Sequence, residues 1–199
     1  MPIDTLTFIF IISAYLIGSL SSAIITCKVM GLDDPRSIGS KNPGATNVLR
    51  LGNKKAAIIT LVGDVLKGLL PVLLSKLVGL NNSIVMLVGI AAFLGHIYPL
   101  YYQFKGGKGV ATAIGVYTAI NSIAALSIVF IWLFCAKLLK ISSSAALIST
   151  LFAPAIFYFL MQDRTITFGM LFITLLIFWK HKTNIQQLLA GTEGKIGEK

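Results

Sequence analysis

Polar loops divide the sequence into apolar stretches long enough to cross a lipid bilayer as helices, which need about 17–25 residues. Five stretches qualify as spans, the last two being short: Leu6–Cys27, Ala56–Leu77, Ser83–Tyr102, Ala145–Met161 and Ile166–Trp179. Only 12% of the residues are charged, against about 25% in a typical soluble domain. The pattern predicts an all-α integral membrane protein, because helices satisfy their own backbone hydrogen bonds in lipid.

The stretch Val110–Leu139 decides how many spans there are. As one helix it would be about 45 Å long, longer than the hydrocarbon core of about 30 Å. Two shorter spans with a turn near Asn121 and Ser122 are the alternative.

Loop charges favour two spans here, and therefore seven in all. The 14 cations then on the inner side are Lys28, Arg36, Lys41, Arg50, Lys54, Lys55, Lys105, Lys108, Lys137, Lys140, Lys180, Lys182, Lys195 and Lys199. The outer side has only Lys76 and Arg164. This asymmetry fits the positive-inside rule. We expect one domain over residues 1–199, with the N-terminus outside and the C-terminus in the cytoplasm.

The net charge of +10 favours an anionic lipid or substrate as partner. The apolar composition argues against nucleic acid. Two cysteines, Cys27 and Cys135, do not make a disulfide framework, and we expect both to be small apolar residues in helices. Two histidines without grouped carboxylates predict no metal site.

The loop after the first span has the composition of an anion-binding loop. Small residues let consecutive backbone N–H groups point outward, and a helix starting near Ala45 would add free N–H groups. Ser40, Thr46 and Asn47 offer polar side chains, and Arg50 offers a guanidinium for a phosphate or carboxylate. The alternative is an ordinary turn with a helix cap, and Arg50 as a membrane anchor.

A second inner loop, Phe104–Thr112, combines glycines with Lys105 and Lys108 before a predicted helix. This is again an anion-binding pattern, although it is not a nucleotide-binding Walker A motif. The alternative is a flexible turn with interfacial lysines. His96, upstream, is interpreted as a hydrogen-bonded structural residue.

Asp64 and Lys67 lie three residues apart inside the second span, and so share a helix face. Ionisable groups inside a span are either functional or neutralise one another. The sequence leaves both interpretations open.

The last span ends in a third polar motif containing His181 and Asn184, also three residues apart. The serine run Ser142–Ser144 joins the preceding spans. A stop-transfer cluster and a helix cap are the simpler interpretations. Because all four segments fall on the inner side, together they suggest one site for a phosphorylated substrate at the membrane surface.

Five motifs follow one another along nearly the whole chain in a characteristic order and spacing. They are Gly39-Ser40-x-Asn42-Pro43-Gly44-Ala45-Thr46-Asn47-x-x-Arg50, Gly95-His96-x-x-Pro99, Phe104-Lys105-Gly106-Gly107-Lys108-Gly109-Val110-Ala111-Thr112, His181-x-x-Asn184-Ile185 and Gly191-Thr192-Glu193. In this order and spacing the chain resembles the bacterial membrane acyl-phosphate:glycerol-3-phosphate acyltransferases.

The resemblance implies a seven-helix enzyme of the bacterial inner membrane with its active site on the cytoplasmic side. It would transfer a fatty acyl group from acyl phosphate to the 1-hydroxyl of glycerol 3-phosphate, giving lysophosphatidic acid and phosphate. No cofactor and no obligatory protein partner are implied beyond the two substrates and the lipid bilayer.

The resemblance also implies roles for individual residues. Ser40 and the backbone of Gly44, Ala45, Thr46 and Asn47 would hold the acyl-donor phosphate. Arg50, Lys108, His181 and Asn184 would position glycerol 3-phosphate, helped by Ser143 or Ser142, with Lys105 as a second candidate for the lysine role. The sequence departs from the family at Lys41, where Gly is more common, and at Gln187, where Arg is common.

The sequence lacks both a Ser-His-Asp arrangement and the His-x4-Asp pattern of soluble-type acyltransferases. We therefore hypothesise that the substrate's own phosphate accepts the proton. A small organic-phosphate transporter, with Asp64 and Lys67 as a gate, is the rival interpretation. A regulatory or scaffold subunit would leave the paired glycine-lysine loops unexplained.

Overall fold

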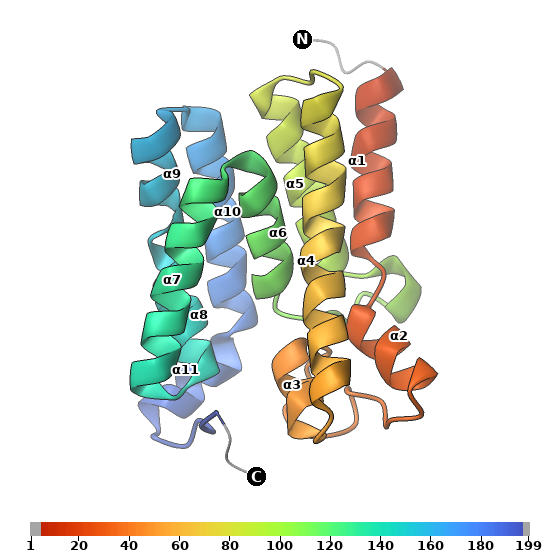
Figure 1. Cartoon of the computed structure of the whole chain (residues 1–199), viewed down its shortest axis with the longest axis vertical. Coiled ribbons are helices and arrows are strands. Elements are labelled where there is room, and N and C mark those ends of the chain that lie inside the picture. The colour runs from red at the N-terminus through yellow and green to blue at the C-terminus, as the bar shows by residue number, and fades with distance from the viewer. Residues whose placement is uncertain (1–4, 197–199) are drawn as a thin grey trace. The chain divides into compact units, whose positions relative to one another are not determined.

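The computed structural model describes residues 5–196, and within this range the regular elements are all helices. The chain divides into two compact units, one ending at Ile120 and the other beginning at Asn121. Figure 1 shows the helices of each unit. The prediction of an all-α membrane protein is confirmed.

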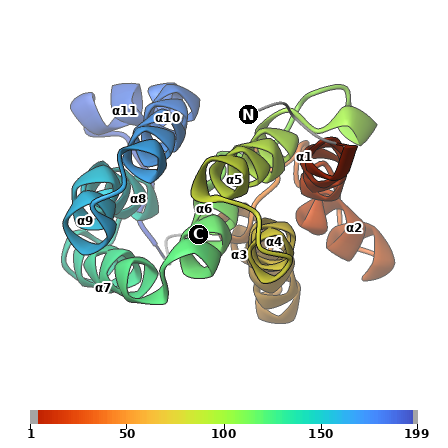
Figure 2. The same cartoon turned by 90° about the horizontal axis from the view of Figure 1, so that it is seen from above.

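Unit 1 is built around α4, which contacts most of the other helices in the unit. Its elements are α1 (Thr5–Gly18), α2 (Ser22–Val29), α3 (Ala45–Arg50), α4 (Lys54–Leu77), α5 (Asn82–Ile97), the 3-10 helix η1 (Leu100–Tyr102) and α6 (Val110–Ile120). Figure 2 shows α1, α4, α5 and α6 nearly end-on, packed side by side.

Glycines set how closely α6 approaches α4. A Cβ atom on Gly115 would collide with the carbonyl oxygen of Val65, and one on Gly68 with that of Thr112. Small residues of this kind let membrane helices pack backbone to backbone. The short α6 is consequently covered by protein over most of its surface, and Val116 and Tyr117 are fully buried.

The first predicted span is broken in the structure. Residues 19–21 separate α1 from α2, and the two helices are bent by 45°. Ser21 caps α2, since its side chain accepts a hydrogen bond from the N–H of Ile24, as serine does at N-caps. The prediction of one helix over Leu6–Cys27 is therefore wrong at residues 19–21, where the chain leaves the helix.

Unit 2 contains α7 (Ser122–Leu139), α8 (Ser142–Leu151), α9 (Ala153–Met161), α10 (Arg164–Lys180) and α11 (Lys182–Leu189). The predicted break in the stretch Val110–Leu139 is present. Asn121 caps α7 by accepting a hydrogen bond from the N–H of Ala124 at 3.0 Å.

Four helical segments in the described range are long and apolar enough to cross a membrane, or five if α1 and α2 form one bent span. The helix α6, with 11 residues, is only about 16 Å long, and α10 has 17 residues. Cys27 and Cys135 are unpaired and lie in α2 and α7, as predicted. That residues 1–199 form one domain stays a prediction.

Candidate active site

The loop between α2 and α3 is organised by the side chain of Asn47, which is 1% exposed. Its amide donates to the carbonyl oxygens of Pro35 at 2.7 Å and Ile38 at 3.1 Å, and its Oδ1 accepts from the N–H of Ser40 at 2.9 Å. A Cβ atom on Gly39 would collide with the same Oδ1. The Asn47 side chain thus holds the loop in shape, a role that the sequence did not reveal.

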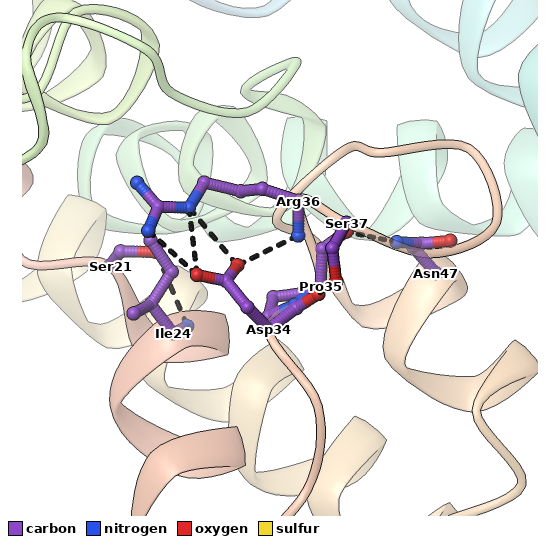
Figure 3. Close-up of polar contacts among 7 residues, drawn as sticks. All are labelled: Ser21, Ile24, Asp34, Pro35, Arg36, Ser37 and Asn47. Carbon is purple, nitrogen blue, oxygen red and sulfur yellow. Dashed lines mark hydrogen bonds and ion pairs between the residues drawn. The ribbon is translucent and has the colours of Figure 1, made fainter.

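Asp34 and Arg36 form an ion pair that also stabilises this loop (Figure 3). The guanidinium donates to both carboxylate oxygens, with the shortest bond at 2.6 Å, and its carbon lies 5.9 Å above the ring of Tyr102. These hydrogen bonds hold the pKa of Asp34 below its ordinary value. Arg36 therefore links the first loop to η1, beside the glycine-rich loop.

Two of the four backbone N–H groups predicted to bind phosphate at the start of α3 already donate within the protein. The N–H of Gly44 donates to the carbonyl oxygen of Asn42 at 2.9 Å, and that of Asn47 to the carbonyl oxygen of Gly44 at 3.0 Å. Gly44, the N-cap of α3, has extended backbone angles and provides no side-chain cap. Gly44 and Ala45 are half-buried, while Ser40, Thr46 and Arg50 are exposed. Of the predicted phosphate-binding residues of the first motif, Ser40 and Thr46 are therefore exposed to solvent, whereas the Asn47 side chain is buried.

The glycine-rich loop Lys105–Gly109 leads into α6. Lys105 is exposed and Lys108 is half-buried. Gly109 has a φ of +88°, and a Cβ atom there would collide with the ring of Phe93. Since L-residues with a Cβ rarely adopt such angles, glycine is required at this position.

In unit 2, His181 lies at the junction of α10 and α11 and is 3% exposed. Its Nδ1 is 2.8 Å from the carbonyl oxygen of Ile177. A carbonyl oxygen can only accept, so Nδ1 carries a proton. The backbone of α10 therefore fixes the orientation and tautomer of the imidazole.

Asn184 and Ser143 meet at the carboxylate of Glu193. The Asn184 amide and the Ser143 hydroxyl each donate to Oε1 at 2.7 Å, and both residues are largely buried. Ser142, the other predicted serine, is half-buried at the start of α8. Glu193 was not among the predicted site residues, although it lies within the last motif of the family resemblance.

Other predicted features also have a defined place in the structure. Asp64 and Lys67 form an ion pair at 2.9 Å, so the two charges neutralise one another. His96 is buried, with Nδ1 3.6 Å from the Asp64 carboxylate. Among residues 5–196 there is no cluster of His, Cys, Asp and Glu that could hold a metal ion.

Comparison with known proteins adds evidence over the whole chain. Residues 8–191 match a family model described as glycerol-3-phosphate acyltransferase. The glycerol-3-phosphate acyltransferase of Burkholderia pseudomallei strain K96243 is 51% identical, over 94% of each chain. That of Cupriavidus metallidurans is 53% identical, over 98% of each chain.

Solved structures of similar fold exist for PlsY (YgiH), described as an integral membrane glycerol 3-phosphate acyltransferase. The glycerol 3-phosphate form has a TM-score of 0.91 and 36% sequence identity, covering 96% of each chain. The lysophosphatidic acid form has a TM-score of 0.90 and 35% identity.

Proposed function

The chain belongs to the glycerol-3-phosphate acyltransferase family, and we propose that it transfers a fatty acyl group from acyl phosphate to the 1-hydroxyl of glycerol 3-phosphate. The products are lysophosphatidic acid and inorganic phosphate, at the start of phospholipid synthesis. The observation that carries the proposal is the likeness over 96% of the chain to an acyltransferase solved in a glycerol 3-phosphate form.

The residue roles are those that the family resemblance implies. Ser40 and the backbone of residues 44–47 hold the donor phosphate. Arg50, Lys108, His181 and Asn184 position glycerol 3-phosphate, with Ser143 or Ser142, and Lys105 is a second candidate for the lysine role. Contacts in unit 2 support the roles of three of these residues, because the Nδ1–H···O=C bond orients His181 and the Glu193 carboxylate orients Asn184 and Ser143.

The proposed chemistry needs no cofactor, because acyl phosphate is a mixed anhydride and is already activated. The 1-oxygen of the acceptor attacks the carbonyl carbon and forms the ester, and the bond from that carbon to the phosphate oxygen breaks. Lysines and backbone N–H groups stabilise the charge that grows on the leaving phosphate. The hydroxyl proton passes to a phosphate oxygen of the substrate, without a protein base.

We further propose seven spans, an outside N-terminus and a cytoplasmic C-terminus in the bacterial inner membrane. The 14 to 2 division of loop cations supports this arrangement, as does the break at Asn121. Single cysteines placed at Lys76 and Lys105, in a chain without Cys27 and Cys135, are expected to react with an impermeant maleimide from opposite sides of sealed vesicles. Labelling of both from one side would overturn the topology.

The function is tested with the purified protein, palmitoyl phosphate and radiolabelled glycerol 3-phosphate. Labelled lysophosphatidic acid should form, and Lys108→Met should lower its rate at least a hundredfold. Palmitoyl-CoA in place of palmitoyl phosphate should give no product. Uptake of labelled glycerol 3-phosphate into vesicles, without acylation, would instead support the transporter.

A further inference from the structure

The buried ion pair in the middle of α4 makes more contacts than charge neutralisation requires. Asp64 and Lys67 have side chains only 3% and 6% exposed. Lys67 Nζ also donates to the carbonyl oxygen of Leu20 at 2.7 Å. Leu20 lies in the break between α1 and α2, so the pair attaches α4 to a non-helical segment.

His96 extends this cluster to the glycine-rich loop. Its Nδ1 faces the Asp64 carboxylate at 3.6 Å, and a Cβ atom on Gly107 would collide with its Nε2. The N–H of Gly107 donates to the carbonyl oxygen of His96 at 3.2 Å. A Cβ atom on Gly106 would collide with that same oxygen. The backbone of residues 106–107 therefore lies directly on His96.

The same cluster shares a small cavity with the loop before α3. Lys67 and His96 line this cavity together with Gly106, Gly107 and Pro43. Pro43 immediately precedes the N-cap of α3. The buried cluster thus contacts the glycine-rich loop through His96 and faces the loop before α3 across the cavity.

We propose that Asp64, Lys67 and His96 are positioning residues that fix the glycine-rich loop Lys105–Gly109 for substrate binding. The proposal depends on the proposed function, in which a lysine of this loop contacts glycerol 3-phosphate. Three glycines give the loop few side chains of its own to hold it. Its position is therefore set by the surface on which it lies, and small displacements at such a site lower rates by up to about a hundredfold.

Replacing both charges with apolar residues distinguishes an ion pair that serves only folding from one that positions the loop. If the two charges serve only folding, replacing both with apolar residues of similar size restores a normal protein, as is often found for buried pairs. If they position the loop, the same double variant folds but binds substrate poorly, since His96 has lost its carboxylate partner.

The first experiment compares Asp64→Leu/Lys67→Met, His96→Phe and the control Lys76→Met with wild type. Folded yield from size exclusion, kcat, and KM for both substrates are measured. We expect the first two variants to raise KM for glycerol 3-phosphate about tenfold or more at near-normal folded yield. Lys76→Met, also in α4, should leave KM unchanged. Wild-type KM in the folded double variant and in His96→Phe would overturn the proposal.

The second experiment tests the contact between His96 and the loop and remains informative if the first variants fold poorly. Gly107→Ala places a methyl group against the His96 imidazole, and His96→Ala removes that ring. The double variant should therefore recover at least threefold in kcat/KM over Gly107→Ala. Gly106→Ala collides with the His96 backbone, so His96→Ala should not rescue it.

Equal rescue at both glycines, or at neither, would refute the geometry. Failure of the proposed function is distinguishable, because wild type would then give no lysophosphatidic acid at all. An active wild type with unaltered KM in the folded variants refutes the positioning role alone.

Discussion

Glu193 allows a stability prediction that can be worked directly from the structure. Its Oε1 accepts two hydrogen bonds of 2.7 Å, from Ser143 Oγ and Asn184 Nδ2. The two donor residues are 7% and 8% exposed. Glu193→Ala removes the acceptor and leaves two buried donors without it, at about 1–3 kcal/mol each. We therefore expect a loss of about 2–6 kcal/mol in the free energy of unfolding.

Glu193→Gln should have a stability between those of wild type and Glu193→Ala. The amide oxygen can still accept from both donors, but a neutral acceptor makes weaker bonds than a carboxylate, by about 1 kcal/mol each. The expected loss is about 2 kcal/mol. Because Ser143 and Asn184 are proposed to contact glycerol 3-phosphate, both Glu193 variants should also raise KM for that substrate.

SDS-induced unfolding from mixed micelles measures these differences. Thr192→Ala is the matched control, since Thr192 is the exposed neighbour and its side-chain hydroxyl makes a long bond, 3.4 Å, to the Gln187 carbonyl oxygen. The backbone bond from the Thr192 N–H to the same oxygen, at 2.8 Å, is kept in this variant. It should change stability by less than about 0.5 kcal/mol. The reasoning is refuted if Glu193→Ala is as stable as Thr192→Ala, or if Glu193→Gln is less stable than Glu193→Ala.

Three further predictions concern unit 1. Lys76 donates to two carbonyl oxygens at the end of α6, at 2.8 and 2.9 Å, so Lys76→Met should lower stability by about 1–2 kcal/mol in the same unfolding assay. Lys41 has a φ of +56°, which favours glycine. Lys41→Gly should therefore raise stability by up to about 1 kcal/mol and Lys41→Val should lower it, and the opposite order would contradict the backbone geometry. The lowered pKa of Asp34 means that folding favours its ionised form. Its contribution to the free energy of unfolding is therefore fully present above the pKa of the unfolded state, about 4. That contribution is lost as the pH falls through the pKa of the folded state. Because the pair is exposed, Asp34→Asn should cost no more than about 1 kcal/mol at pH 7, and no measurable amount below the folded pKa.

The helical membrane fold could be predicted from local sequence, whereas the roles of the site residues stay predictions. The apolar stretches predict membrane helices because a backbone in lipid must satisfy its own hydrogen bonds, which an apolar helix of sufficient length does. Asn121 was correctly identified as a break, since an asparagine between two apolar helices is a strong N-cap. The family resemblance implies that glycine is more common at position 41, and the φ of +56° at Lys41 is a backbone angle that favours glycine.

Other features depend on contacts between residues distant in the chain, which periodicity and spacing cannot reveal. The break at residues 19–21 is joined to Lys67, 47 positions away from Leu20. Ser143 and Glu193, 50 positions apart, share one hydrogen bond. The sequence suggests that the Asn47 side chain binds substrate. In the structure that side chain instead hydrogen-bonds the backbone of the loop between α2 and α3.

The sequence alone determined that this is a helical membrane protein with glycine- and cation-rich loops, because composition and motif spacing are properties of the chain itself. Only the tertiary structure decided that Asp64 and Lys67 neutralise one another and that His96 lies between this pair and the glycine-rich loop. The physical reason is that a buried charge is stabilised by whichever groups the fold places beside it. A sequence specifies those neighbours only through the whole packed arrangement.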